Sequence, residues 1–145
     1  MTLKGKYAEN KVREKLKEME AAGCAFHRFP DAMAGSLVTS PSDFMVMKEG
    51  RLILLEVKEV NHAYRLPLKN YSPDQMARMR MWEAAGAKAL VVIYFTPLRA
   101  WRWVTTQDLF ESKQVLLSQP KPGGSWNFSQ TPATTLTHVF EEIEW

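Results

Sequence analysis

Two carboxylates and a lysine follow a spacing that brings them together at one end of a hairpin. Asp43 comes just before the apolar run FMVM, and Glu56 and Lys58 lie late in the run RLILLEVKEV. Glu49-Gly50, between the two runs, is typical of a two-residue hairpin turn. With that turn, Asp43 falls directly opposite Glu56, and Lys58 points to the same face two residues further on.

This placement of charges points to a divalent metal ion. Opposed carboxylates repel each other, and the remaining hairpin residues are apolar on both faces, so we expect both faces to be covered. Oxygen ligands of this kind suit Mg²⁺, for which Mn²⁺ would substitute. The alternative is that Asp43 and Glu56 are surface strand residues, with Lys58 paired to one of them. The three residues in register favour the metal site.

The elements that must position this hairpin alternate between helices and strands, which predicts an α/β fold with a mixed sheet flanked by helices. Ser72, Pro73 and Gln75 fit a helix N-terminus with a capping box. In chain order we expect a helix over 4–22, a strand over 24–29, a loop or arm over 30–41, strands over 42–48 and 51–60, and a connector over 61–71. A helix to about 85, strands over 88–95 and 100–106, a short helix to 117, a loop or extended segment over 118–135, and a final strand or short helix follow.

The hairpin charges resemble a nuclease signature. Asp43, twelve intervening residues and then Glu56-Val57-Lys58 resemble the PD-(D/E)XK motif, with Pro41-Ser42-Asp43 in place of the family's Pro-Asp. Glu9, in the preceding helix, resembles that family's additional glutamate. The resemblance covers roughly residues 5–104 and implies a restriction-endonuclease-like core.

Within that superfamily the chain is most similar to Holliday junction resolvases of the RecU and archaeal Hjc type, phage versions included. The residues that carry this similarity are Ser42 before the aspartate, the stretch Arg65-Leu66-Pro67-Leu68-Lys69, and Gln75 in the following helix. The similarity implies a Mg²⁺-dependent endonuclease that resolves four-way DNA junctions by paired cuts, leaving 5′-phosphates. Two alternatives stay open: a nuclease acting on duplex or flap DNA, and a catalytically idle DNA-binding domain.

The resemblance also assigns roles to residues. The catalytic set is Asp43, Glu56, Lys58, Glu9 and Gln75, and the metal ligands are Asp43, Glu56 and the Val57 carbonyl. The expected DNA contacts are Ser42, Arg65, Lys69, Arg78 and Arg28. Gln75 could instead serve only as a capping residue, and Glu9 could be a solvated helix residue. Cutting two opposed strands implies a homodimer, and the strand AWRWV suggests an exposed tryptophan surface for it.

Composition narrows the class of protein. We expect one nuclease domain over 1–145, with a core of about 5–104 and an extension over 105–145. The single cysteine excludes an internal disulfide and a cysteine-based zinc site. No apolar run is long enough for a membrane span, and the charged N-terminal residues predict no secretory signal. A net charge of +3 is compatible with a polyanionic partner. We expect a cytoplasmic protein of a bacterial, archaeal or phage-infected cell.

Overall fold

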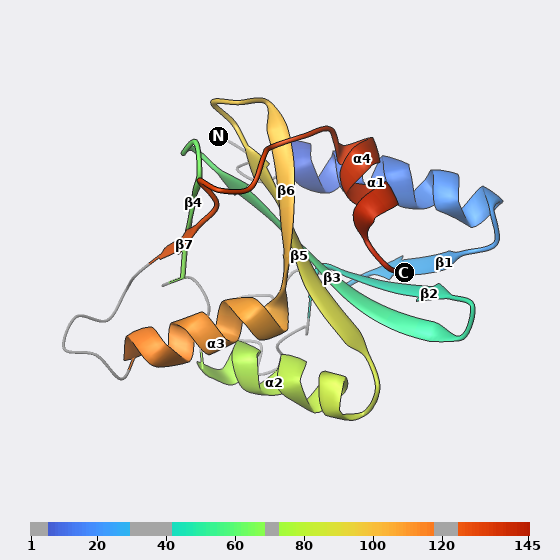
Figure 1. Cartoon of the computed structure of the whole chain (residues 1–145). Helices are drawn as coiled ribbons and strands as arrows, with labels where there is room; N and C mark the ends of the chain where they lie inside the picture. Colours follow the sequence, from blue (N-terminus) through green and yellow to red (C-terminus); the bar gives the residue numbers. More distant parts are fainter. Residues whose placement is uncertain (1–5, 30–41, 69–72, 118–124) are drawn as a thin grey trace.

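A five-stranded mixed sheet, in the order β1-β2-β3-β5-β6, forms the centre of the molecule. The structure, a computed structural model, describes residues 6–29, 42–68, 73–117 and 125–145. Figure 1 shows helices on both sides of this sheet. The elements are α1 (Lys6–Ala21), β1 (Ala25–Arg28), β2 (Phe44–Lys48), β3 (Arg51–Val60), β4 (Arg65–Pro67), α2 (Pro73–Ala84), β5 (Lys88–Phe95), β6 (Ala100–Thr105), α3 (Thr106–Leu117), β7 (Ser125–Asn127) and α4 (Leu136–Glu142). The predicted α/β fold with a mixed sheet flanked by helices is confirmed.

The two faces of the sheet carry separate cores, as alternation along the strands requires. On one face, α1 and α4 pack through residues such as Val12, Leu16 and Val139. On the other face, α2 and α3 pack through Met79 and Leu109, among others. Residues beyond 105 therefore contribute to both cores.

The β2–β3 hairpin has the predicted register. Lys48 pairs with Arg51, and the ladder continues outward to Phe44 opposite Leu55. Glu49 and Gly50 have φ angles of 51° and 78°, the left-handed conformation that a tight turn between twisted strands requires.

β3 is the central strand and is covered on both faces. It runs antiparallel to β2 and parallel to β5, with Glu56 level with Val91 of β5. A parallel pair needs a crossover, and α2 lies on that connection. The carboxyl end of β3 is thereby placed beside the start of α2.

Two sequence-based expectations need correction. The connector over 61–71 contains β4, which pairs with β7 in a small second sheet. Trp101 is 5% exposed and lies in the α1-side core, so the AWRWV strand has no exposed tryptophan face there. The alternation of tryptophan and arginine suggested that one face of this strand is exposed, but Arg102, on the opposite face from Trp101, is also buried. The expected arm over 30–41 lies outside the described residues.

No helix in the described part of the chain is long and apolar enough to span a membrane.

Candidate active site

Asp43 lies at the start of β2, where the chain enters the hairpin. Its Oδ2 accepts a hydrogen bond of 2.7 Å from the backbone N–H of Val57 in β3. Its own carbonyl accepts from the N–H of Phe29, which follows β1. Three neighbouring segments therefore hold this carboxylate at the carboxyl end of β3, where the register predicted it.

Glu56 is the most deeply buried charged group of the site, with 5% of its surface exposed. Its Oε1 accepts a hydrogen bond of 2.9 Å from Gln75 Nε2 on α2, and Lys58 Nζ lies 3.5 Å from the same oxygen. Its Oε2 is buried and has no hydrogen-bond partner among the described residues. An orphaned carboxylate oxygen in such a place costs free energy unless a ligand completes it.

Burial controls the electrostatics of both carboxyl groups. Desolvation raises the pKa of Glu56, and the neighbouring charge of Lys58 opposes that rise more than any other group. Desolvation also raises the pKa of Asp43, opposed first by the hydrogen bond from Val57 N–H. The nearby charge of Glu9 raises the pKa of Asp43 further. Together these groups form a small acidic cluster that is stabilised by positive charge.

Glu9 reaches this cluster from α1. Its side chain is largely buried and pairs with the guanidinium Nε of Arg28 on β1, and more distantly with Lys6. The residue before it, Ala8, donates a backbone N–H hydrogen bond of 3.2 Å to Glu59 of β3. This N–H is one of the donors that the first turn of a helix leaves unpaired. This contact fixes the start of α1 against β3 and so positions Glu9.

These donors fit a hard divalent ion. Asp43 and Glu56 supply carboxylate oxygens, and Glu56 Oε2 is the buried atom that lacks a partner in the described structure. Among described residues, no group of three or more His, Cys, Asp or Glu side chains is arranged for a metal. Mg²⁺ commonly takes one or two carboxylates and keeps several water ligands, so two carboxylates are enough.

The expected DNA-contacting residues lie in different surroundings. Arg65 lines the cleft beside the site and lies over the ring of Tyr64, with its guanidinium carbon 5.5 Å from the ring centroid. Ser42 is buried, and its hydroxyl donates 2.7 Å to the carbonyl of Phe44, so this side chain supports the start of β2. Arg78 is exposed on α2, and Lys69 lies outside the described residues.

One cleft of about 610 Å³ is lined by several of the predicted site residues, among them Glu9, Asp43 and Lys58. Sequence reasoning missed three of its polar residues, Glu59, Asn61 and His62, because none of them belongs to a recognisable sequence motif. They enter the cleft because they lie at the carboxyl end of β3, where the chain turns toward β4. The residues that line it are Glu9, Asp43, Val57, Lys58, Glu59, Val60, Asn61, His62, Arg65 and Pro67.

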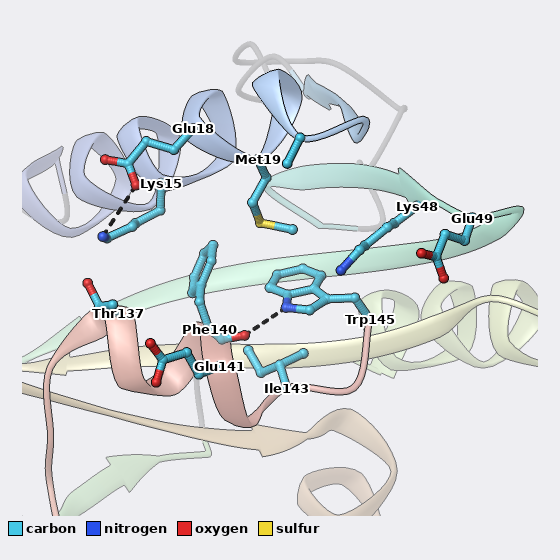
Figure 2. A pocket seen from close by; sticks show the side chains of 11 residues that line it. Lys15, Glu18, Met19, Lys48, Glu49, Thr137, Phe140, Glu141, Ile143 and Trp145 are labelled. Carbon is cyan, nitrogen blue, oxygen red and sulfur yellow. Dashed lines mark hydrogen bonds and ion pairs between the residues drawn. The ribbon is translucent and has the colours of Figure 1, made fainter.

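A second cleft, of about 590 Å³, lies between α1 and α4. In Figure 2, the apolar side chains of Phe140, Ile143 and Trp145 lie on the opposite side of the cleft from Lys15 and Glu18 of α1. The indole N–H of Trp145 donates 2.8 Å to the carbonyl of Phe140, which folds the last residue onto α4. Its acidic residues, such as Glu18 and Glu141, are exposed.

Comparison with known proteins agrees with this description. The structure is similar to that of Hjc, a Holliday junction resolvase from the archaeal hyperthermophile Archaeoglobus fulgidus, with a TM-score of 0.56 and 23% identity over 88% of this chain and 95% of that one. At that identity the likeness establishes the fold alone. The sequence model of the RecU family, Recombination protein U, matches residues 33–121. The chain therefore belongs to the RecU family, as the resemblance predicted, and membership implies an endonuclease. No curated protein sequence matches the chain.

Proposed function

We propose that this protein is a metal-dependent endonuclease that resolves four-way DNA junctions by paired phosphodiester hydrolysis. Family membership supports the resolvase class. The observation that carries the metal dependence is the buried Glu56 Oε2, which lacks a partner among the described residues. The proposed ion is Mg²⁺, held by Asp43, Glu56 and the Val57 carbonyl, and Mn²⁺ would substitute.

Each residue of the site has a distinct part in this mechanism. When bound, Mg²⁺ would supply Lewis-acid stabilisation of the phosphate and a more acidic water. Lys58 orients the attacking water and stabilises negative charge on the phosphate oxygens. Gln75 is a positioning residue, because its amide holds Glu56 Oε1 and leaves Oε2 for the ion. Glu9 adds negative charge beside Asp43, balanced by Arg28.

In this proposal, positively charged side chains around the cleft bind the DNA backbone. Arg65 lies in the cleft itself, and Arg28 adjoins Asp43 through its pair with Glu9. Arg78, which is exposed on α2, and Lys69, which lies outside the described residues, are further DNA contacts in the proposal, whereas the buried Ser42 is left out. On α1, Lys11 and Lys15 pair with Glu14 and Glu18, so these lysines are solvated ion pairs and contribute less.

Two opposed strands must be cut in a junction, which requires two sites. We infer a twofold homodimer in which each chain, folded as one domain over 1–145, carries one site. Trp82, which is 37% exposed on α2, is one candidate for that surface. The proposed setting is the cytoplasm, where DNA is the partner.

Cleavage of a synthetic four-way junction beside matched linear duplex and flap DNA tests this function. We expect paired symmetric nicks in the junction with Mg²⁺, and none with a chelator. Equal cleavage of duplex or flap would discard junction selectivity but keep the nuclease. Binding to all three DNAs with no cleavage under any divalent ion would favour a catalytically idle DNA-binding domain.

A further inference from the structure

His62 lies at the far end of the active-site cleft and has no part in the mechanism above. It follows β3 by two residues and lines the same cavity as Asp43, Lys58 and Arg65. Its side chain is partly exposed. An imidazole in a cleft proposed to hold DNA has access to the DNA backbone.

The loop that carries His62 is fixed on both sides by hydrogen bonds. Asn61 Oδ1 accepts 3.1 Å from the hydroxyl of Thr96, which follows β5. The carbonyl of Ala63 accepts 2.8 Å from the buried guanidinium of Arg102, and the carbonyl of Tyr64 accepts 2.7 Å from the N–H of Phe128. Arg102 is itself 7% exposed and lies against the ring of Phe95. The loop therefore presents His62 from a rigid support.

The ring of His62 is held in one orientation and one tautomer. Its Nδ1 accepts hydrogen bonds of 3.1 Å from the backbone N–H groups of both Tyr64 and Arg65. The ring also packs edge-to-face against Tyr64, with centroids 4.8 Å apart. Because Nδ1 is the acceptor, the ring proton is on Nε2, and the imidazole is a neutral donor.

The cleft is long enough to face more than the scissile phosphate. His62 is four positions after Lys58, so at about 3.3 Å per extended residue the two Cα atoms are at most about 13 Å apart. One DNA strand carries a phosphate for each ~3.4 Å of helix axis. A donor within that distance of Lys58 can therefore reach a phosphate other than the scissile one.

Resting on the proposed function, we propose that His62 donates a hydrogen bond from Nε2 to a non-scissile backbone phosphate of the DNA strand in the cleft. Arg65, in the same cleft, would contribute a charged contact, whereas the hydrogen bond from His62 is directional and comes from a neutral group. The pair fixes the register of the strand relative to Lys58. His62 is then a positioning residue for the substrate.

Two substitutions separate this contact from the support of the loop. His62→Asn keeps an acceptor where Nδ1 lies, able to take the Tyr64 N–H as asparagine does in an Asx turn, but loses the donor that reaches the cleft. His62→Gln keeps a donor at about the reach of Nε2. His138→Asn is the matched control, because His138 is exposed on α4 and pairs with Glu142 there.

Binding to a synthetic four-way junction is measured with EDTA present, so that the DNA stays intact. We expect His62→Asn to bind about 10-fold more weakly, the effect of one hydrogen bond to a charged group. Its melting temperature and its log–log salt slope should match the unsubstituted protein, because a neutral donor releases no counterion. Arg65→Ala should instead lose about 0.9 from that slope. His62→Gln should bind within about 3-fold of the unsubstituted protein.

Neutral methylphosphonates placed singly around the cut site identify the contacted phosphate. One replacement should weaken binding by the unsubstituted protein about 10-fold and by His62→Asn no further. Equal binding by His62→Asn and the unsubstituted protein would overturn the inference while leaving the nuclease intact. A reduced salt slope in His62→Asn would mean that His62 contacts the phosphate as a charged group, which would overturn the inference of a neutral donor. Failure of the unsubstituted protein to bind any DNA would reject the proposed function and this inference together.

Discussion

The two clefts of this protein have nearly the same volume, about 610 Å³ at the end of β3 and about 590 Å³ between α1 and α4, yet their chemistry differs. The first is lined by charged groups such as Asp43 and Lys58, and it adjoins Glu56, whose buried Oε2 has no partner in the described structure. In the second, aromatic and aliphatic groups form the base, and acidic groups such as Glu141 are exposed at the rim. The candidate active site is therefore distinguished by a buried carboxylate oxygen without a partner in the described structure, and not by the volume of its cleft.

The largest expected contrast is in catalysis. Glu56→Gln should lower junction cleavage by roughly 10³-fold, because it removes the buried charge that we propose holds the ion. Glu141→Gln, the matched change in the second cleft, should leave the rate unchanged. Single-turnover cleavage measures both variants.

Junction binding by Glu56→Gln should be retained or tightened, since the substitution leaves the phosphate-contacting cations in place. Loss of binding together with cleavage, in a variant that melts as the unsubstituted protein does, would contradict this separation of roles. Asp43→Asn should behave like Glu56→Gln.

The second contrast is in stability. Phe140 is 9% exposed in the base of the α1–α4 cleft and belongs to the core of that face. Phe140→Ala should lower the free energy of unfolding by about 3 kcal/mol, the cost of a cavity in a core. Denaturant titration measures this, and cleavage well below the melting temperature should stay normal. A large rate loss in the folded variant would mean that the second cleft takes part in function.

The third contrast concerns the support of Glu56. Gln75→Ala removes the amide that holds Oε1, so the half-saturating Mg²⁺ concentration for cleavage should rise 10- to 100-fold. Gln107→Ala changes an exposed glutamine on α3 and serves as the control. If Gln75→Ala keeps the normal Mg²⁺ dependence but melts at a lower temperature, Gln75 is a capping residue only.

The smallest effect is a gain of stability without metal. With chelator at pH 7, Glu56→Gln should raise the free energy of unfolding by about 1–2 kcal/mol, because it removes a buried charge that lacks one partner. Burial raises the pKa of folded Glu56 above its ordinary 4.5, so folding favours the protonated form. The contribution of Glu56 to the stability of the unsubstituted protein is therefore fully present below pH 4.5 and is lost as the pH rises through the folded pKa.

With chelator present, the difference in the free energy of unfolding between Glu56→Gln and the unsubstituted protein should accordingly grow as the pH rises from 4.5 through the folded pKa of Glu56. Adding Mg²⁺ should raise the melting temperature of the unsubstituted protein and leave that of Glu56→Gln unchanged. A lower stability of Glu56→Gln in chelator at pH 7 would mean that the charge is already compensated.

The sequence predicted those parts of the site that depend on strand register. A two-residue turn fixes every pair along β2 and β3, so Asp43, Glu56 and Lys58 could be brought together without a structure. The places of His62 and Arg102 could not be predicted. The loop that carries His62 is fixed by the pairing of β4 with the distant β7 and by the buried guanidinium of Arg102, and both are long-range contacts. Likewise, Trp101 is buried because α4 covers β6, a long-range contact that alternation does not encode.

The central claim is that the buried carboxylates at the end of β3 hold the divalent ion. Calorimetric titration with Mn²⁺ on the unsubstituted protein, Glu56→Gln and Glu141→Gln tests it most directly. We predict binding to the unsubstituted protein and to Glu141→Gln, and none to Glu56→Gln. Equal binding to all three, or no binding to the unsubstituted protein with or without DNA, would contradict the account.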